Sequence, residues 1–485
     1  MALSAVLLAL CAGAVDSESW AMFRGGPFRD GYTSSVGPTS NGTAWKFLLR
    51  TESLAPPTVH PDGARIYVGA GDGLYCVKRD GTYGWFFEVK PGVVDSAPAV
   101  DAARNLVIFG GMDGVIYALN ARTGRQIWSV TSGKQTDGRA GYVFSSVVLD
   151  DRGVAYVGAA DGALRAIATE PAMPDGVRVL WSYDARGEPI WSSPALSEDQ
   201  SIVYVGGVDN YVHAVSTADG TQLWEFEAGG FPDDLDDPDV DSSPAVSRRD
   251  GTVFVGSFDN RLHALDGDTG ALKWSYATKD NIISSPALSA DASIVYVSSM
   301  DGAVHAVDAA SGRRVWAADL GSPIYSEPVV DGNGVLFAGA DDGNFYALDA
   351  ATGAVKWAHA IGDKVRGEPA VVDGRIYVVA LNVDPFLHCI GGPTPPPAGE
   401  RGGAAADTRE LLPVVAATAL ATLGAALVIL CLAAFASRYT RSRSRQMRGH
   451  ALLSQQLIDD VSPVSSFVEL SDRAASGNGP LTRVF

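Results

Sequence analysis

The densest group of residues that could bind a metal ion is an acidic segment at residues 232–241, which contains six aspartates. Asp237, Asp239 and Asp241 alternate along it in the manner of a calcium-binding loop, where hard oxygen ligands gather around one ion. The bidentate glutamate that ends such loops is missing. The segment is therefore a calcium site or a solvated acidic loop. We expect no other metal ion and no cofactor.

The histidines predict no metal site. Four of them occupy one position of a repeated sequence unit, and tyrosine stands at that position in other units. The residues are His213, His263, His305 and His388, with Tyr75, Tyr117 and Tyr346 as equivalents. A position shared with tyrosine indicates packing, and zinc-binding histidines are spaced more closely along a chain.

Cys76 and Cys389 stand at the next position of the same unit. Equivalent positions of neighbouring units are expected to lie about 10 Å apart, whereas a disulfide needs Cα atoms within about 7 Å. Two buried thiols are favoured, and a disulfide stays open as the alternative.

The elements that position these residues are repeated, because eight of the ten tryptophans recur at intervals of 40, 43, 53, 43, 50, 42 and 41 residues. They are Trp45, Trp85, Trp128, Trp181, Trp224, Trp274, Trp316 and Trp357. The two longest intervals contain insertions at residues 169–179 and 232–241. A fixed period of this length is typical of propellers and solenoids.

Each unit predicts four short antiparallel strands. In the fifth unit these are residues 241–246, 251–256, 262–266 and 272–276, with an Asp-Asn hairpin before the third strand. The last unit has three strands and no tryptophan strand, while residues 43–49 have the pattern of the missing strand. The sequence therefore predicts an all-β, eight-bladed β-propeller with four-stranded antiparallel blades, closed by an N-terminal strand. Seven or six blades with irregular ends remain the competing counts.

The sequence Ala-Leu-Asp-Ala-Ala-Thr-Gly-Ala-Val-Lys-Trp at residues 347–357 resembles the tryptophan-docking motif of pyrroloquinoline-quinone-like repeats. Residues 118–128, 264–274 and 306–316 resemble it as well, and residues 20–32 resemble the lead-in of such propellers. The resemblance covers about residues 20–392 and extends to the scaffold lipoprotein of the bacterial outer-membrane barrel-assembly machinery, which is similar in fold. It implies that each tryptophan packs between adjacent blades, which specifies fold more than function.

The same resemblance implies a quinoprotein dehydrogenase as one function. Such enzymes have a disulfide between neighbouring cysteines, a calcium ion held by Glu, Asn and Asp, and a catalytic aspartate. This chain has no adjacent cysteines. We therefore expect no enzyme, no catalytic residue and no cofactor-binding residue.

The residues just before each innermost strand are expected to surround one mouth of the central channel, and they differ from blade to blade. They are Asp95, Phe144, Trp191, Asp241, Ile283, Tyr325 and Arg366. Function in repeat scaffolds is carried by loops on a rigid frame. Asp95, Trp191, Asp241, Tyr325 and Arg366 are thus candidates for binding a small polar ligand or a protein partner, with ordinary loop variability as the alternative.

The ends of the chain predict a membrane protein. Residues 1–14 fit a signal peptide, with a buried N-terminal helix as the alternative. Residues 411–436 are apolar and uncharged, and five arginines follow within twelve residues. This pattern predicts one C-terminal transmembrane helix with its C-terminal side in the cytoplasm. A stalk at residues 393–410 and a disordered tail at residues 437–485 complete the expected organisation.

This organisation is that of a type I single-pass protein in the secretory pathway or at the cell surface, with residues 15–392 as a lumenal or extracellular, monomeric propeller. Asn41 begins its one glycosylation sequon. The net charge of −19 argues against a nucleic-acid partner. The leading hypothesis is a non-catalytic scaffold that recruits proteins or a small polar ligand. A quinone- or calcium-dependent oxidoreductase and a lumenal sensor receptor are the alternatives.

Overall fold

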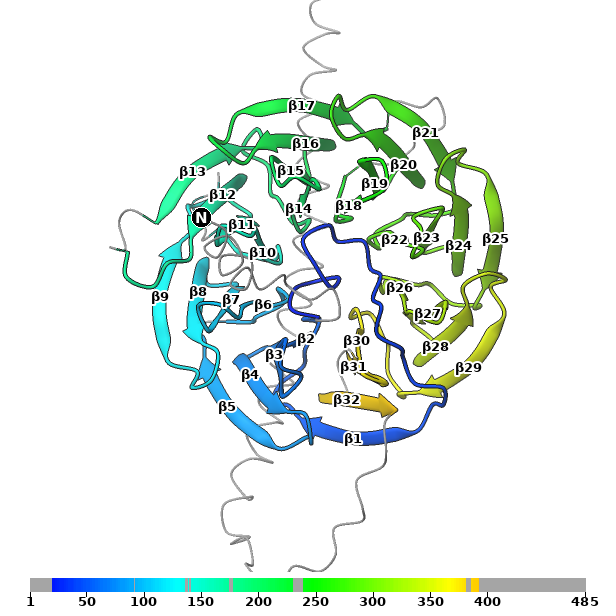
Figure 1. Cartoon of the computed structure of the whole chain (residues 1–485), viewed down its shortest axis with the longest axis horizontal. Helices are drawn as coiled ribbons and strands as arrows, with labels where there is room; N and C mark the ends of the chain where they lie inside the picture. Colours follow the sequence, from blue (N-terminus) through cyan, green and yellow to red (C-terminus); the bar gives the residue numbers. More distant parts are fainter. Residues whose placement is uncertain are drawn as a thin grey trace, which may run out of the picture. The chain divides into compact units, whose positions relative to one another are not determined.

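The computed structural model describes residues 20–90, 92–135, 138, 141–173, 178–229, 239–380 and 385–391. These residues form eight four-stranded antiparallel sheets, arranged as blades around a central axis (Figure 1). The predicted all-β, eight-bladed propeller is confirmed. The predicted signal peptide, stalk, transmembrane helix and tail lie outside the described residues. Within the described residues, no helix has the length and hydrophobicity that crossing a bilayer requires.

The blades are numbered here in chain order, each from its innermost to its outermost strand. Blade 1 contains β2 (Thr58–Val59), β3 (Arg65–Ala70), β4 (Gly73–Lys78) and β5 (Tyr83–Glu88); blade 2 contains β6 (Ala99–Asp101), β7 (Leu106–Gly110), β8 (Val115–Asn120) and β9 (Gln126–Thr131). Blade 3 contains β10 (Val148–Leu149), β11 (Val154–Gly158), β12 (Ala163–Ala168) and β13 (Val179–Asp184); blade 4 contains β14 (Ala195–Leu196), β15 (Ile202–Gly206), β16 (Tyr211–Ser216) and β17 (Gln222–Glu227).

Blade 5 contains β18 (Ala245–Val246), β19 (Thr252–Gly256), β20 (Arg261–Asp266) and β21 (Leu272–Ala277); blade 6 contains β22 (Ala287–Leu288), β23 (Ile294–Ser298), β24 (Ala303–Asp308) and β25 (Arg314–Asp319). Blade 7 contains β26 (Val329–Val330), β27 (Val335–Gly339), β28 (Asn344–Asp349) and β29 (Val355–Ala360); blade 8 contains β30 (Ala370–Val372), β31 (Arg375–Val379), β32 (Phe386–Gly391) and β1 (Thr43–Leu48).

Burial explains why the inner and outer strands differ in sequence. Strand β19 (TVFVG) is buried at every position because neighbouring blades cover both of its faces. In outer strand β29 (VKWAHA), exposed residues alternate with half-buried ones over most of the strand. The inner strands are consequently continuous runs of β-branched and aromatic residues, which suit a strand covered on both sides.

The tryptophans of the outer strands join each blade to the next. The indole Nε1–H of seven of them donates to a backbone carbonyl of the following blade. The donor and acceptor residues are Trp45 and Arg79, Trp85 and Ala121, Trp128 and Thr169, Trp181 and Thr217, Trp224 and Gly267, Trp274 and Ala309, and Trp316 and Ala350. The distances run from 2.8 to 3.4 Å. The packing between blades that the resemblance implied is present.

The repeat position held by histidine or tyrosine has a polar role that the sequence analysis did not predict. In five units the side chain at this position bonds to the aspartate four residues earlier, which begins the hairpin; these side chains are Tyr117, His213, His263, His305 and Tyr346. Tyr75 donates to Asp72, three residues earlier. His263 contacts Asp259 at 2.7 Å, and Tyr346 donates to Asp342 at 2.6 Å. The position is structural, as expected, but it satisfies a carboxylate as well as packing.

Strand β1 lies beside β32 in blade 8, antiparallel to it, and Trp45 is opposite Cys389. The N-terminal and C-terminal ends of the propeller thus share one sheet. Cys76 and Cys389 are buried, unpaired thiols. This agrees with the prediction of two buried thiols, which was favoured over a disulfide.

Residues 20–36, the N-terminal strap, run once around the channel axis and visit blades 1 to 8 in order (Figure 1, dark blue trace). Backbone N–H groups of the innermost strands, and of the β30–β31 turn in blade 8, donate to its carbonyls at 2.8–2.9 Å. The donor and acceptor residues are Val59 and Trp20, Val100 and Ala21, Leu196 and Pro27, Val246 and Phe28, Leu288 and Asp30, Val330 and Gly31, and Gly374 and Val36. In blade 3, the Leu149 N–H meets the Met22 sulfur at 3.3 Å. The strap therefore covers the channel end opposite the predicted mouth.

Candidate functional site

The candidate residues of the mouth lie at equivalent places in five blades, each just before an innermost strand. Asp95 belongs to blade 2, Trp191 to blade 4, Asp241 to blade 5, Tyr325 to blade 7 and Arg366 to blade 8. Leu54, which is 40% exposed, occupies this place in blade 1 and was missed. Its surroundings read Leu-Ala-Pro-Pro in place of the Ser-containing motif of blades 2 to 7, so no repeat signal marked it.

The first serine of each motif is structural. Its hydroxyl accepts the backbone N–H that ends the second strand of its own blade, as between Ser96 and Gly110 at 2.9 Å. The second serine joins blades: Ser193 N–H donates to the Ser243 hydroxyl at 2.8 Å, and Ser243 N–H donates to the Ser285 hydroxyl at 3.1 Å. This bonding holds the inner wall of the channel rigid below the mouth.

Two carboxylates replace the second serine in the last two blades, namely Glu327 in blade 7 and Glu368 in blade 8. Glu368 has no exposed surface, and burial raises its pKa to about 8. Glu327 keeps some accessible surface, and burial raises its pKa to about 7. Arg24 of the strap opposes both shifts, because its positive charge stabilises the ionised carboxylates.

Arg24 and Arg29 of the strap enter the channel and have no exposed surface. Arg24 pairs with Glu368, with 3.5 Å between Nη1 and Oε1, and donates to the Pro286 and Pro328 carbonyls at 2.5 and 3.2 Å. Arg29 donates to the Pro194 and Val147 carbonyls at 3.0 and 2.8 Å. Burial lowers the pKa of Arg29 to about 9. Both guanidinium groups are thus held by the protein itself.

Asp95 and Asp241 are half-buried carboxylates at the mouth. Desolvation raises the pKa of Asp95 to about 6, with a further contribution from the like charge of Glu52. Desolvation alone raises the pKa of Asp241 to about 7. The Asp241 Oδ1 atom has almost no accessible surface and no hydrogen-bond partner among the described residues.

Two aromatic side chains lie on the blades between these aspartates. Phe144 and Trp191 make an edge contact, with 6.3 Å between ring centroids and 68° between planes. Trp191 is 42% exposed. An exposed tryptophan supported by a second ring is a common feature of binding surfaces.

Arg366 is neutralised on the other side of the mouth. Its guanidinium donates to both Asp341 carboxylate oxygens at 2.8 and 2.6 Å and lies 3.8 Å from the ring centroid of Tyr325. Lys364 adds a second contact to Asp341 at 3.3 Å. The structure thus brings Tyr325 and Arg366 together, away from the aspartates of blades 2 and 5.

The proposed calcium ligands are only partly within the described chain. Asp239 and Asp241 are described, whereas Asp237 lies outside the described residues. In the part of the chain that the structure describes, no three His, Cys, Asp or Glu side chains come together to hold a metal ion. The calcium site therefore stays a prediction, because one of its three proposed ligands lies outside the described residues.

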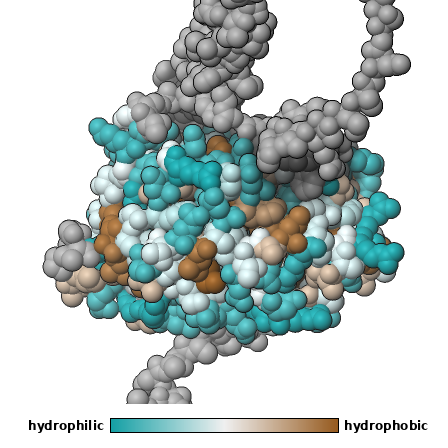
Figure 2. All heavy atoms as spheres, turned by 90° about the horizontal axis from the view of Figure 1, so that it is seen from above, coloured by the Kyte–Doolittle hydropathy of each residue, from teal (hydrophilic) through white to brown (hydrophobic). Residues whose placement is uncertain are grey.

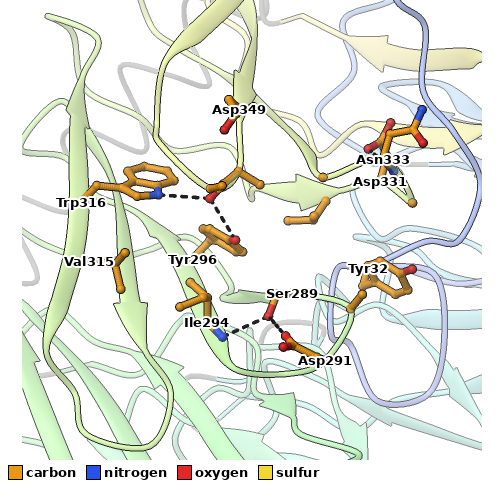
Figure 3. Close-up of a pocket in the computed structure, with 16 residues that line it drawn as sticks. Tyr32, Ser289, Asp291, Ile294, Tyr296, Val315, Trp316, Asp331, Asn333 and Asp349 are labelled. Atoms are coloured by element: carbon orange, nitrogen blue, oxygen red, sulfur yellow. Dashed lines mark hydrogen bonds between the residues drawn. The ribbon is translucent and has the colours of Figure 1, made fainter.

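A separate pocket of about 510 Å³ lies between blades 6 and 7, at the end covered by the strap (Figure 3). Three of its polar side chains bond within the protein. Trp316 and Tyr296 both donate to the Ala350 carbonyl, and Ser289 donates to Asp291 at 2.7 Å. What remains is an apolar groove beside Val315 and Ile294.

Exposed apolar residues also occur on the outer strands, where the propeller side seen in Figure 2 shows separate patches within a mostly hydrophilic surface. They include Leu180, Leu223, Leu272, Val315 and Val355. Scattered apolar residues of this kind are normal on folded proteins. At the mouth, the exposed Trp191 ring stands on a blade between those of the carboxylates Asp95 and Asp241.

Known structures share this fold at low sequence identity. BamB from Moraxella catarrhalis is 18% identical, with a TM-score of 0.59 over 73% of this chain and 100% of its own. A europium-containing methanol dehydrogenase is 17% identical, with a TM-score of 0.61 over 75% of this chain and 89% of its own. The quinohemoprotein alcohol dehydrogenase from Comamonas testosteroni is 15% identical, with a TM-score of 0.64 over 80% and 83%. An assembly factor and dehydrogenases thus share the fold, which leaves catalysis undecided.

A comparison with curated protein sequences found no significant match. The family model described as outer membrane protein assembly factor BamB matches residues 29–205, 208–302 and 300–388, which is most of the chain. This protein therefore belongs to the BamB family of pyrroloquinoline-quinone-like repeat propellers.

Proposed function

We propose that this chain is a non-catalytic binding or scaffold protein, whose propeller recruits a partner protein or a small polar ligand at the channel mouth. One observation supports this proposal above others. The strap closes one channel end with backbone hydrogen bonds to the blades, while Trp191, Asp95 and Asp241 at the other end differ from their equivalents in neighbouring blades. A rigid, repeated frame with one non-repeating end is the arrangement that binding proteins of this kind use.

The proposed setting is a type I single-pass membrane protein with the propeller in the lumen or outside the cell. It is supported by the sequence of residues 1–14 and 411–436, which lie outside the described residues, and by Asn41, whose side chain is exposed. Removal of N-glycans should reduce the apparent mass of the cellular protein, and Asn41→Gln should abolish the change. An unshifted wild-type protein would argue against lumenal exposure of the propeller.

The binding function is tested by proximity labelling from the lumenal side with full-length protein. Trp191→Ala should reduce the recovery of the main labelled partners. Leu272→Ala is the matched control, because Leu272 is similarly exposed at 43% but lies on an outer strand. Equal partner recovery for both variants would contradict recruitment at the mouth.

A quinone-dependent oxidoreductase is the alternative that the fold suggests, and the channel residues do not fit its cofactor. Pyrroloquinoline quinone is a tricarboxylate and needs cationic partners. Arg24 and Arg29 are buried and bond to backbone carbonyls, Arg24 also pairs with Glu368, and Arg366 is paired with Asp341. The remaining accessible ionisable groups of the channel include Asp95 and Asp241, which would repel such a ligand.

The enzyme alternative has a direct test on the full-length protein. Pyrroloquinoline quinone and calcium are added, and binding is followed by absorbance and thermal shift together with dye-linked alcohol oxidation. We expect neither binding nor oxidation, and dye reduction that depends on both additions would overturn the scaffold proposal. For the sensor alternative, deletion of residues 438–485 should abolish signalling, whereas a scaffold should keep its labelled partners.

A further inference from the structure

The mouth has two chemically different halves. One half, which we name the acidic–aromatic arc, consists of Asp95, Phe144, Trp191 and Asp241 on consecutive blades 2 to 5. The other half contains Ile283, Tyr325 and Arg366, followed by Leu54 of blade 1. The charges of the two halves differ, because Arg366 is neutralised by Asp341 whereas Asp241 has no hydrogen bond to its buried oxygen among the described residues.

The buried carboxylate oxygen of Asp241, unpaired among the described residues, is energetically unfavourable. A carboxylate withdrawn from water loses hydration, and a protein normally compensates with hydrogen bonds or an opposite charge. The equivalent position in blade 6 is Ile283, so the fold itself does not require a carboxylate there. A cationic ligand would supply the missing partner.

The aromatic pair belongs to the two blades that precede the blade of this carboxylate. Trp191 and Asp241 each stand two residues before the serines that join blades 4 and 5, with 2.8 Å between the Ser193 nitrogen and the Ser243 hydroxyl. Trp191 has 42% of its surface exposed and is supported from the side of blade 3 by Phe144. A cation above an indole ring is attracted by the ring quadrupole, so the ring and the carboxylate favour the same kind of ligand.

The rest of the mouth selects against anions. Arg366 cannot offer its charge without breaking two bonds to Asp341 of 2.8 and 2.6 Å. The positive groups deeper in the channel are fully buried, and Glu327 and Glu368 lie beside Arg24. An anionic group would therefore meet unneutralised carboxylates first.

We infer that the acidic–aromatic arc binds an arginine side chain of the partner protein, with the guanidinium between the Trp191 ring and the Asp241 carboxylate. Arginine fits better than lysine, because its planar group stacks on an aromatic face while its N–H groups bond a carboxylate. Asp95, three blades away and beside Glu52, favours a second basic residue in the same segment. The chain's net charge of −19 adds long-range attraction for such a segment. This inference rests on the proposed binding function and specifies the partner's chemistry.

The test uses full-length protein and a fluorescein-labelled peptide, Gly-Arg-Gly-Arg-Gly, followed by fluorescence anisotropy. The glutamine peptide Gly-Gln-Gly-Gln-Gly is the charge control. Asp241→Asn and Trp191→Ala should each weaken binding of the arginine peptide by about tenfold, as loss of a central contact does. Asp151→Asn is the matched variant, because Asp151 is exposed on the β10–β11 loop at the opposite end and its change removes the same charge. It should leave binding unchanged.

Several outcomes would overturn the inference. Equal weakening by Asp241→Asn and Asp151→Asn would mean that only net charge attracts the peptide. Equal binding of the glutamine peptide would remove the guanidinium from the recognition. Binding of free N-acetyl-argininamide as tightly as the peptide would assign the arc to a small cation instead of a protein segment. A thermal unfolding scan of each variant shows whether the propeller is intact.

The failure of this inference differs from the failure of the proposed function. If Trp191→Ala abolishes partner labelling but no arginine peptide binds, recruitment at the mouth stands and the arginine chemistry is wrong. If Trp191→Ala leaves partner labelling unchanged, the proposed function itself is wrong.

Discussion

Arg24 and Glu368 form an ion pair with 3.5 Å between Nη1 and Oε1, although 344 residues separate them and neither side chain has exposed surface. Glu368 Oε2 also accepts the Arg24 backbone N–H at 3.3 Å. The pair connects the beginning of the propeller to its last blade at the channel axis. The N-terminal and C-terminal parts of the propeller are therefore joined at two places, by this ion pair and by the pairing of β1 with β32.

Replacing Arg24 by methionine should destabilise the propeller strongly at about pH 9, because Glu368, whose pKa is about 8, is then ionised and buried without its counter-charge. Loss of one member of a buried pair typically lowers the free energy of unfolding by about 3–5 kcal/mol. Lys90→Met is the control: Lys90 pairs with Glu88 at the surface, where such pairs contribute less than about 1 kcal/mol. Chemical denaturation of both variants measures the difference.

A double-mutant cycle shows whether the effect belongs to the pair. Arg24→Met combined with Glu368→Gln should cost less than the sum of the single changes by at least about 1 kcal/mol, because the glutamine carries no charge to be stranded. Strict additivity would show that Arg24 acts through its bonds to the Pro286 and Pro328 carbonyls.

Gly270→Ala should destabilise blade 5 more than Gly251→Ala does. Both glycines have left-handed φ angles, +71° and +69°, so both changes carry a backbone cost of about 1–2 kcal/mol. A Cβ at Gly270 would lie 2.6 Å from the Trp224 ring, whereas a Cβ at Gly251 meets nothing within 4 Å. The extra clash should add about 1–3 kcal/mol. Equal losses of thermal stability would show that the tryptophan shifts freely.

Asp241→Asn should stabilise the protein at alkaline pH and not at acidic pH. The raised pKa of Asp241, about 7, means that the folded state holds this proton more tightly than the unfolded chain, so the wild type loses stability as the pH rises from about 4 to 7. Asparagine removes that loss. The melting temperature of the variant should exceed the wild type's at about pH 8, and the two should converge at about pH 4.

The carboxyl group of Asp291 should change the stability with pH in the opposite direction. Hydrogen bonds from Ser289 and Ser293 lower its pKa to about 2, so its contribution to stability is present above about pH 4 and is lost as the pH falls towards 2. Asp291→Asn should therefore lower the melting temperature at about pH 7. The same pH slope for Asp241→Asn and Asp291→Asn would contradict the different environments of the two carboxyl groups.

Cys76 and Cys389 should resist alkylation in the folded protein. Both thiols are buried, and desolvation raises the pKa of each to about 12, which suppresses the reactive thiolate. Iodoacetamide should label both in denaturant without prior reduction, as peptide mass spectrometry detects. Labelling that requires a reductant would show a disulfide.

The sequence by itself determined the repeated part of this protein. The tryptophan intervals and the Asp-containing hairpins predict eight four-stranded blades, because these signals are local and recur in every unit. The equivalence of His263 with Tyr75 also predicted a structural role for the histidines. The bond to Asp259 was not predicted, since hydrophobic periodicity does not describe polar contacts.

Only the tertiary structure decided what lies inside the channel. The sequence of the strap has no repeat period, and its hydrogen bonds join groups that lie tens to hundreds of residues apart in the chain. The sequence therefore contained no sign of the roles of Arg24 and Arg29 beyond their place in the lead-in. Glu327 and Glu368 are single departures from a serine position, and their meeting with Arg24 depends on closing the ring. The sequence predicted Arg366 as a candidate for ligand binding, whereas its pairing with Asp341, 25 residues earlier in the chain, appears only in the folded structure. Long-range charge pairing of this kind is set by which loops the blades bring together, and sequence spacing does not encode it.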